Sequence, residues 1–340
     1  MVAGHSGRGD RRAGRDLFHR IGWPRTGFDR PEPGGTAVNE PARKTIGFLG
    51  LGHMGAPMAA NLVRAGYDVH AFDPMPAAQE TAREAGIRLV ESGVAAAVDR
   101  DIVITMLTNG KLVRDVYGEL VPAARPGTLF IDCSTIDVAD AKAAAEMAVA
   151  AGHRALDAPV SGGVAGAAAG TLTFMVGGAE ADFAEALPVL DVMGGKVVHC
   201  GANGVGQVAK ICNNMLLGIS MIGLSEALVL GEKLGLSHQS FFDVVSKASG
   251  QSWALTSYCP VPGPVPSSPA NNDYEPGFAT ALMNKDLGLA ANALRTNGVD
   301  GQLGLLAAQI YERFNQSAGG KDFSAIVTDI RNRSEQEGAQ

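Results

Sequence analysis

The stretch of residues 44–73, KTIGFLGLGHMGAPMAANLVRAGYDVHAFD, constrains the fold of this chain more than any other part of the sequence. It begins with an apolar run rich in β-forming residues, passes into a Gly-x-Gly-x-x-Gly segment, and continues with apolar residues at helical spacing. This order predicts a strand, a tight glycine loop and a helix. A second short apolar run, residues 67–72, then ends on the acidic Asp73.

Each glycine of this loop has its own role in a unit of strand, loop and helix. Gly50 permits the turn at the end of the strand, Gly52 lets the backbone approach a diphosphate closely, and Gly55 lets the helix pack against the strand. Free N–H groups at the start of the helix and the positive end of its dipole attract the same diphosphate. We therefore expect a dinucleotide to be bound by Gly50, Leu51, Gly52, His53, Met54 and Gly55.

Asp73 predicts which dinucleotide is bound. A carboxylate at the end of the second strand of such a unit accepts hydrogen bonds from the ribose hydroxyls of NAD and repels the 2′-phosphate of NADP. No arginine follows Asp73 immediately, so we expect NAD as the cofactor. His53 is expected to be an exposed loop residue rather than a catalytic one.

From residue 44 onward, short apolar runs alternate with helical segments, which is typical of βαβ units and a parallel sheet. The predicted strands are residues 45–49, 68–72, 102–106, 129–132, 155–158, 172–176 and 197–199. The helices predicted between them include residues 76–85, 111–120 and 139–151. Ligands of open α/β sheets lie beside the carboxyl ends of strands, although ordinary turn chemistry is an equal alternative for any single residue there. We therefore expect the cofactor to lie beside Met106, Leu107, Thr108 and Thr135.

The sequence pattern changes after residue 204. Residues 205–234 form one long helical pattern, and further helices follow, interrupted by the proline-rich segment 259–275, which is expected to be an extended surface loop. The apolar part of the long pattern, residues 215–224, is too short and too interrupted by Gly and Ser to predict a membrane span, and indicates a buried helix that links two domains. The prediction is an α/β protein with a Rossmann-type dinucleotide-binding domain at 44–204 and an all-α domain at 205–340.

Residues 1–43 differ from the rest of the chain. They are rich in Arg, Gly and Pro and lack a sustained apolar period, which predicts a disordered extension. An arginine-rich organellar presequence is the competing interpretation, and the acidic residues in this segment argue against it. With no apolar signal segment, we expect a cytoplasmic location, or the mitochondrial matrix if the extension is a presequence.

Overall composition favours a small molecule as partner. The 28 basic and 35 acidic side chains give a formal net charge of -7, which offers no reason to expect nucleic acid or an anionic membrane surface. The cysteines show no C-x-x-C pairing, so we expect small, buried, reduced side chains and no metal site. They are Cys133, Cys200, Cys212 and Cys259.

Two further segments carry polar groups without an obvious packing role. Residues 157–163, DAPVSGG, combine the Ser161 hydroxyl with a glycine-rich turn, which suits either a carboxylate cradle or an ordinary tight turn. Lys210 and Asn214 are four residues apart on the long helix and therefore share one face. A cation and an amide are costly to bury unless they are paired or used, but most lysines on such helices extend to water. Residue types alone leave both questions open.

Four ordered segments resemble the β-hydroxyacid dehydrogenase family. They are residues 50–55, residues 157–163, residues 201–214 with their KICNN core, and residues 277–288 with Lys285 and Asp286. The resemblance extends from residue 44 to about residue 329, and residues 249–289 agree best with one particular member of the family. It implies NAD-dependent oxidation of a short acid that carries its hydroxyl on the β carbon.

The resemblance also implies roles for the matched residues. Lys210 corresponds to the catalytic lysine, which takes the hydroxyl proton while hydride leaves the same carbon for the nicotinamide. Asn214 matches the residue that orients the substrate, and Lys285 matches a second lysine beside the cofactor. The alternative for Lys285 is a surface charge beside Asp286. The carboxylate cradle corresponds to Ser161, Gly162 and Gly163.

Two other functions fit the same resemblance. The chain could keep the fold and the lysine but act on another small acid, such as tartronate semialdehyde, 3-hydroxypropionate or 4-hydroxybutyrate. It could also be a catalytically silent NAD-binding interaction protein, although such relatives lack the lysine that is present here as Lys210. The apolar character of the long helix predicts a homo-oligomer, a dimer or a tetramer.

Overall fold

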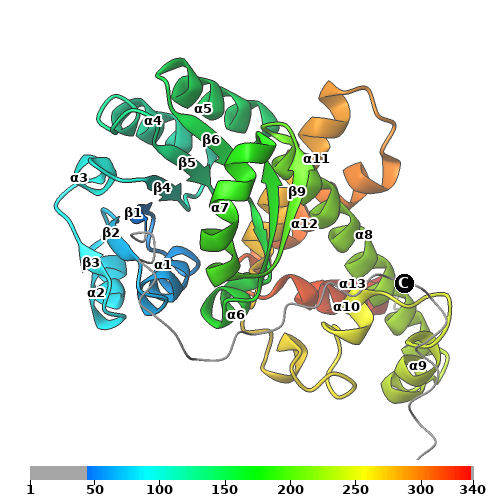
Figure 1. Ribbon diagram of the computed structural model, residues 1–340. Helices are drawn as coiled ribbons and strands as arrows, with labels where there is room; N and C mark the ends of the chain where they lie inside the picture. Colours follow the sequence, from blue (N-terminus) through cyan, green and yellow to red (C-terminus); the bar gives the residue numbers. More distant parts are fainter. Residues whose placement is uncertain (1–43, 338–340) are drawn as a thin grey trace, which may run out of the picture. The chain divides into compact units, whose positions relative to one another are not determined.

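Nine strands form a single sheet in the computed structural model, which describes residues 44–337. The extension predicted at residues 1–43 lies outside the described residues. The strands lie in the order β3-β2-β1-β4-β5-β6-β8-β7, and β9 pairs with β8 (Figure 1). They are β1 (Thr45–Leu49), β2 (Asp68–Phe72), β3 (Arg88–Leu89), β4 (Ile102–Thr105), β5 (Leu129–Asp132), β6 (Arg154–Asp157), β7 (Val160–Ser161), β8 (Leu172–Gly177) and β9 (Gly194–Gly201).

The order of the first strands reverses between β1 and β4. Strand β1 pairs in parallel with β2 on one side and with β4 on the other, and β5 and β6 continue the parallel arrangement. This is the strand order of a Rossmann-type sheet, in which the crevice at the reversal binds the ligand. The loops after β1 and β4 therefore meet at this edge of the sheet.

The sheet departs from the predicted parallel arrangement at one end. Strand β8 runs antiparallel to β6 and β7 and parallel to β9. After β6 the chain passes through β7 and the short helix α6 (Gly163–Ala169) at the carboxyl edge and re-enters the sheet there, so β8 runs in the opposite direction. Strands β3 and β7 were not predicted, because each has only two residues and two residues cannot show an alternation of apolar and polar side chains.

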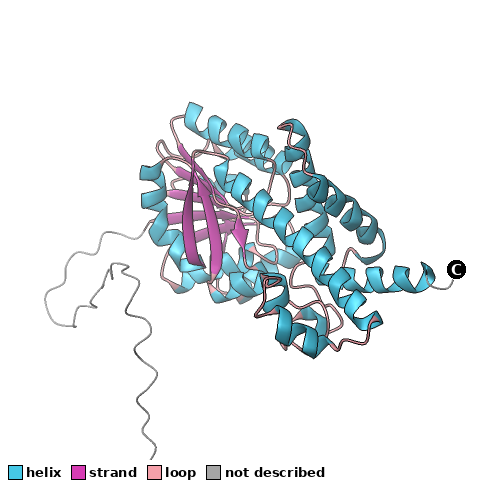
Figure 2. Cartoon of the chain, turned by 90° about the vertical axis from the view of Figure 1, so that its right-hand side faces the viewer, coloured by secondary structure: helices cyan, strands magenta, loops and turns pink. Residues whose placement is uncertain are grey.

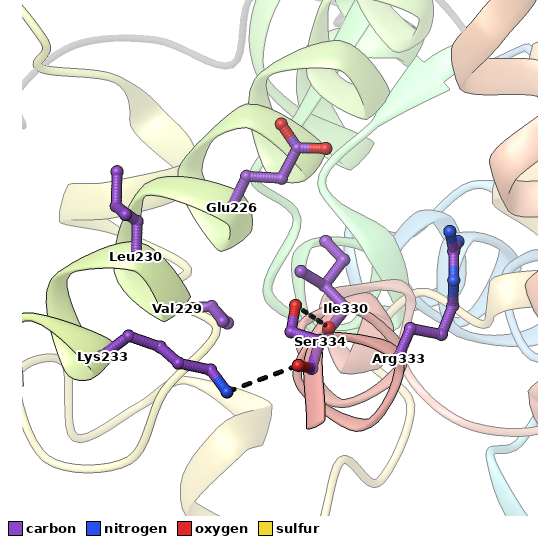
Figure 3. A pocket seen from close by; sticks show the side chains of 7 residues that line it. All are labelled: Glu226, Val229, Leu230, Lys233, Ile330, Arg333 and Ser334. Atoms are coloured by element: carbon purple, nitrogen blue, oxygen red, sulfur yellow. Dashed lines mark hydrogen bonds between the residues drawn. The ribbon is translucent and has the colours of Figure 1, made fainter. Parts of the chain in front are cut away.

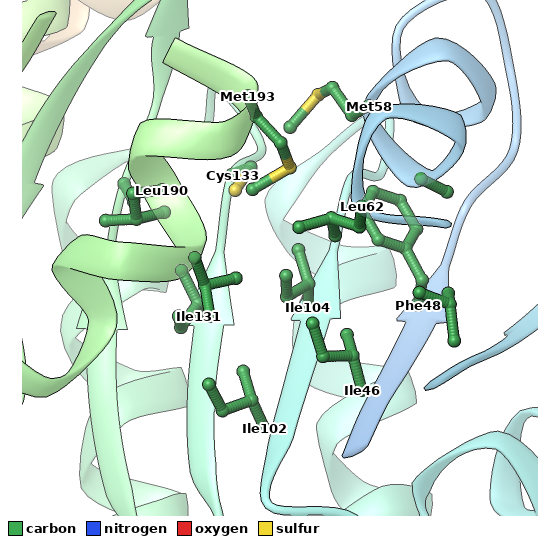
Figure 4. Packing of buried hydrophobic residues seen from close by; sticks show 14 of the residues in the cluster. Ile46, Phe48, Met58, Leu62, Ile102, Ile104, Ile131, Cys133, Leu190 and Met193 are labelled. Atoms are coloured by element: carbon green, nitrogen blue, oxygen red, sulfur yellow. The ribbon is translucent and has the colours of Figure 1, made fainter. Parts of the chain in front are cut away.

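Helices cover both faces of the sheet (Figures 1 and 2). The helices of this half are α1 (Gly55–Arg64), α2 (Pro76–Glu84), α3 (Gly93–Ala97), α4 (Gly110–Leu120), α5 (Val138–Ala150), α6 and α7 (Glu180–Met193). Alternate residues of the central strands point to opposite faces. On one face Ile46, Ile104 and Ile131 pack against Met58 and Leu62 of α1 and Leu190 of α7 (Figure 4). On the other, Val103 and Phe130 pack against α4 and α5.

The rest of the described chain is helical, as predicted. Its helices are α8 (Val205–Lys233), α9 (His238–Val245), α10 (Trp253–Thr256), η1 (Pro269–Asn271), α11 (Thr280–Thr296), α12 (Gln302–Ala318), η2 (Phe323–Ala325) and α13 (Ile326–Glu337). Helix α8 contacts β8 and β9 at its start and α11, α12 and α13 further along. The side chains of Met221, Met283, Leu287 and Tyr311 are fully buried in the core of this half.

By length and composition, helix α8 is long and apolar enough to span a membrane. The apolar stretch at residues 215–224, from which no membrane span was predicted, is only part of this helix. The core helix of a globular protein passes the same test. Several of its side chains, including Lys210, Asn214 and Met221, are buried against the rest of this protein. Its packing is therefore that of a core helix.

Two predictions from the sequence are corrected here. The proline-rich segment 259–275 is not an extended surface loop, because Cys259, Val261 and Ala270 are buried and it contains the short helix η1. Cys259, Val261 and Val265 of this segment pack in the helical core. The cysteines in the described residues are free, but only Cys133 and Cys259 are buried, and Cys212 faces outward from α8.

Candidate functional site

The glycine loop after β1 has the backbone geometry that its sequence predicts. Gly50 has a φ of 91° and donates its N–H to the Phe72 carbonyl oxygen, which turns the chain off the strand. A Cβ atom at Gly55 would lie 1.8 Å from the Gly50 carbonyl oxygen, so any side chain there would separate α1 from the loop. A Cβ atom at Gly52 would meet no atom within 4 Å.

These features fit the diphosphate of a dinucleotide. The open space beside Gly52 lies at the start of α1, where the N-cap residue Met54 supplies no side-chain cap. The first N–H groups of a helix and its dipole favour a negative charge at such a place. His53 is exposed in the same loop, as predicted.

Asp73 lies at the carboxyl end of β2 and is buried. Its Oδ2 accepts a hydrogen bond from the Leu51 N–H over 2.7 Å, and its Oδ1 accepts one from the Met75 N–H over 2.8 Å. The carboxylate therefore fixes the glycine loop as well as presenting a negative charge beside it. This second role was not expected from the sequence.

The loops after β4 and β5 lie beside the glycine loop. A Cβ atom at Gly50 would approach the Met106 carbonyl oxygen to 2.2 Å, which shows how closely the two loops pack. The Leu107 N–H donates to the Ser134 hydroxyl over 2.8 Å. Thr108 is exposed at the same edge. The structure thus brings together the strand-end residues that the sequence singled out, and their contact with a cofactor stays a prediction.

Lys210 is buried in α8 with only 5% of its surface exposed. Burial lowers the pKa of its amine below the ordinary value of 10.5. The nearby carboxylate of Asp286 opposes this effect, and the positive charge of Lys285 adds to it. Within the described residues the charges of Asp286 and Lys285 act on the Lys210 amine and no hydrogen bond holds it, so it is available to a ligand.

Asn214 lies one helical turn after Lys210 and is buried. Its Nδ2 donates to Asp286 Oδ2 over 2.5 Å, and its Oδ1 accepts a hydrogen bond from Asn213. The second N–H of Asn214 remains available for a substrate oxygen. Asp286 was noted only as the neighbour of Lys285 in the sequence, and its hydrogen bond to Asn214 could not be read from either segment.

Lys285 joins the helical half to the edge of the sheet. Its Nζ donates to the Thr135 carbonyl oxygen over 2.8 Å and lies 3.7 Å from Asp286 Oδ1. Lys285 is therefore more than a surface charge beside Asp286, because its side chain also contacts the loop after β5. This contact brings Thr135, Lys285 and Asp286 into the surroundings of Lys210.

Ser161 ends β7, and Gly162 and Gly163 turn the chain from β7 into α6, beside the helical half. Gly162 and Gly163 have φ values of 137° and 62°, which glycine adopts readily. A Cβ atom at Gly163 would lie 3.0 Å from the Gly277 carbonyl oxygen, so the turn packs closely against the segment before α11. Ser161 is partly exposed beside it.

The region around Lys210 is distinct from a groove of about 460 Å³ between α8 and α13 (Figure 3). The groove is lined by apolar residues such as Val229 and Ile330 and by the charged ends of Glu226, Lys233 and Arg333. None of the predicted site residues lines it. In the described residues, no group of three or more His, Cys, Asp or Glu side chains could hold a metal ion.

Both halves of the described chain match known protein families. Residues 45–201 match the family described as the NAD binding domain of 6-phosphogluconate dehydrogenase, and residues 204–330 match the NAD-binding domain of NADP-dependent 3-hydroxyisobutyrate dehydrogenase. A probable 3-hydroxyisobutyrate dehydrogenase of Mycobacterium tuberculosis is 55% identical over 291 residues, which cover 86% of this chain and 99% of that protein. An NAD-dependent L-serine dehydrogenase of Pseudomonas aeruginosa is 43% identical over 287 residues, 83% of this chain and 96% of that protein.

A solved structure agrees with these matches. The 3-hydroxyisobutyrate dehydrogenase of Mycobacterium tuberculosis, described together with L-serine, has 55% sequence identity and a TM-score of 0.83, and the alignment covers 85% of this chain and 99% of that one. The Rossmann-type sheet, its glycine loop and these relatives define an NAD-dependent dehydrogenase. Within that class, the chain belongs to the 3-hydroxyisobutyrate dehydrogenase family of β-hydroxyacid dehydrogenases.

Proposed function

We propose that this protein catalyses the NAD-dependent oxidation of 3-hydroxyisobutyrate to methylmalonate semialdehyde, a step of valine breakdown, with Lys210 as general base. The observation that carries the proposal is the buried Lys210 amine, which forms no hydrogen bond within the described residues, beside the Asn214 and Asp286 pair. A general base must be able to exist uncharged near neutral pH, and burial favours the uncharged amine.

The residues of the chain divide the work of this reaction. The turn at Ser161 and Gly162 holds the substrate carboxylate through its hydroxyl and backbone N–H groups. Asn214 donates its free N–H to the substrate hydroxyl oxygen, and Lys210 Nζ accepts the hydroxyl proton. When bound, NAD supplies the nicotinamide that receives the hydride from the same carbon. In the reverse reduction, Lys210 returns the proton to the oxygen.

The same proposal assigns parts of the chain to separate tasks. Residues 44–204 bind the cofactor, and Asp73 selects NAD over NADP because its charge repels a 2′-phosphate. Residues 205–340 supply Lys210 and Asn214 to the substrate and Lys285 to the cofactor, and they carry the contacts between subunits. We place the protein in the cytoplasm, or in the mitochondrial matrix if residues 1–43 are a presequence.

A substrate panel tests the assignment. We expect 3-hydroxyisobutyrate with NAD to give the highest kcat/KM among 3-hydroxyisobutyrate, L-serine, 3-hydroxypropionate and 4-hydroxybutyrate, and tartronate semialdehyde to be reduced more slowly with NADH. Steady-state rates with NAD and NADP side by side make the measurement. A clearly higher kcat/KM for another hydroxyacid of the panel would overturn the assignment of 3-hydroxyisobutyrate as substrate. The protein would still be an NAD-dependent dehydrogenase.

L-serine is the second candidate substrate. It is also an acid with a hydroxyl on the β carbon, and both the Pseudomonas relative and the solved Mycobacterium structure carry it in their descriptions. Its ammonium group is what distinguishes it from 3-hydroxyisobutyrate. The panel separates the two, because an enzyme shaped for serine should lose most of its kcat/KM when this ammonium is replaced by a methyl group.

We also infer that the protein forms a homo-oligomer, a dimer or a tetramer, through its helical half. Three apolar side chains near the end of α8 and on α9 are largely exposed: Leu230 at 60%, Leu234 at 78% and Val244 at 65%. The groove beside Leu230 adds further apolar surface (Figure 3). Sedimentation velocity at micromolar concentration should show a dimer or a tetramer, and a single monomeric species would contradict this.

A further inference from the structure

Gln207 lies three residues before Lys210 on α8 and has 0% of its surface exposed. Its Nε2 donates to the Ser134 carbonyl oxygen over 2.7 Å, and its Oε1 accepts from the Ile136 N–H over 3.2 Å. These two bonds enclose Thr135, whose carbonyl oxygen accepts the hydrogen bond from Lys285. One side chain therefore clamps the loop after β5 to the helix that carries Lys210.

The backbone of the same helical turn is fixed to the sheet. Asp157, at the end of β6, accepts hydrogen bonds from the Gly204 N–H over 2.6 Å and from the Gln207 N–H over 3.0 Å. A Cβ atom at Gly206 would lie 2.3 Å from the Met175 carbonyl oxygen. The first turn of α8 thus packs directly on the sheet, and the direction of the Gln207 side chain follows from this position.

The clamped loop is also tied to the loop after β4. The Ser134 hydroxyl donates to Asp132 Oδ1 over 2.6 Å and accepts from the Leu107 N–H over 2.8 Å. Thr105 donates to the same carboxylate oxygen over 2.8 Å. Burial raises the pKa of Asp132 to about 6. A continuous set of hydrogen bonds therefore connects Leu107, Ser134 and Gln207, that is, both strand-end loops and α8.

We propose that Gln207 is a positioning residue of this active site, whose amide holds the Lys210 amine at a set distance from the strand-end loop at Thr135. The inference rests on the proposed function, in which Lys210 carries the proton. An amide that uses both its donor and its acceptor fixes the loop in two directions, whereas an apolar side chain of the same size only fills the space. Misplacement by about 1 Å can cost about 100-fold in rate.

The test replaces this amide without changing its volume. In the full-length enzyme, Gln207→Met should lower kcat for 3-hydroxyisobutyrate about 30-fold, while KM and NAD affinity change little, because binding contacts remain and alignment is lost. The primary deuterium isotope effect on kcat should rise as hydride transfer becomes slower. Burial keeps a carboxyl group neutral, so in Gln207→Glu the side chain can still donate to Ser134 and accept from Ile136; this variant should retain more kcat than Gln207→Met and serves if Gln207→Met fails to fold.

Asn271 provides a matched control. Its amide also clamps a loop, donating to the Val265 carbonyl oxygen and accepting from the Gly263 N–H, but it lies in the proline-rich segment. Asn271→Leu should leave kcat and the isotope effect unchanged. Gln207 variants with a lower Tm but an unchanged kcat would overturn the inference. Turnover retained in Lys210→Met would instead overturn the proposed function, so the two failures are distinguishable.

Discussion

Replacement of Lys210 by methionine should lower kcat for the oxidation about 1000-fold and leave the affinity for NAD unchanged. Methionine keeps the length of the side chain in α8 but cannot accept the hydroxyl proton. The Lys210 amine is buried and forms no hydrogen bond within the described residues, so its removal costs the folded chain only the attraction between its charge and the Asp286 carboxylate. Steady-state rates and a fluorescence titration with NAD measure the two quantities separately.

The pH dependence of kcat/KM should differ between the wild-type enzyme and Lys210→Met. Oxidation needs the uncharged amine, so kcat/KM for oxidation should increase with pH as Lys210 loses its proton. The midpoint of this increase should lie below pH 10.5, because burial lowers the pKa of Lys210. Reduction should show the opposite slope. In Lys210→Met the residual rate of oxidation should no longer increase with pH in this range. A residual rate with the same pH dependence as the wild type would contradict the role of Lys210.

The lowered pKa of Lys210 also makes the free energy of unfolding depend on pH. The folded chain has the lower Lys210 pKa, so in the pH range between that value and 10.5 the unfolded chain binds more protons. The free energy of unfolding therefore rises with pH in this window, and Lys210→Met should remove this contribution and raise Tm at neutral pH.

Lys196→Met, at an exposed position of β9, is the matched control and should change neither kcat nor Tm. Wild-type turnover in Lys210→Met would show that another group carries the proton.

The sequence predicted those parts of the site whose cause is local. Gly50 and Gly55 could be assigned separate roles because a tight turn and a close helix contact each depend on a few neighbouring residues. The shared face of Lys210 and Asn214 followed from the helical spacing alone. These features need only the order of residues along one segment.

The sequence could not predict partners that are distant along the chain. Gln207 bonds to residues 71 and 73 positions away, and Asn214 bonds to Asp286 72 positions away. The position of Gln207 on the long helix follows no pattern that indicates its partner. The antiparallel direction of β8 was likewise hidden, because the apolar run at residues 172–176 looks the same in either direction.

Replacement of Gly52 by valine should raise the Kd for NAD about 100-fold, or about 3 kcal/mol, without unfolding the protein. An ideal Cβ atom at this position meets no atom of the chain within 4 Å, so the folded structure has room for the side chain. The same space is where the diphosphate approaches the loop backbone at the start of α1. The added methyl groups would occupy it and hold the phosphate oxygens away from the N–H groups.

Two further glycine variants separate this effect from damage to the fold. Gly55→Val should unfold the chain, because its Cβ atom would lie 1.8 Å from the Gly50 carbonyl oxygen. Gly223→Ala, on an exposed face of α8 with no atom within 4 Å, should leave both Tm and NAD affinity at or above the wild-type level. Calorimetric titration with NAD and thermal melts distinguish the three. If Gly52→Val bound NAD as tightly as the wild type, the diphosphate could not lie against this loop, and the orientation of the nicotinamide toward Lys210 would have to be abandoned with it.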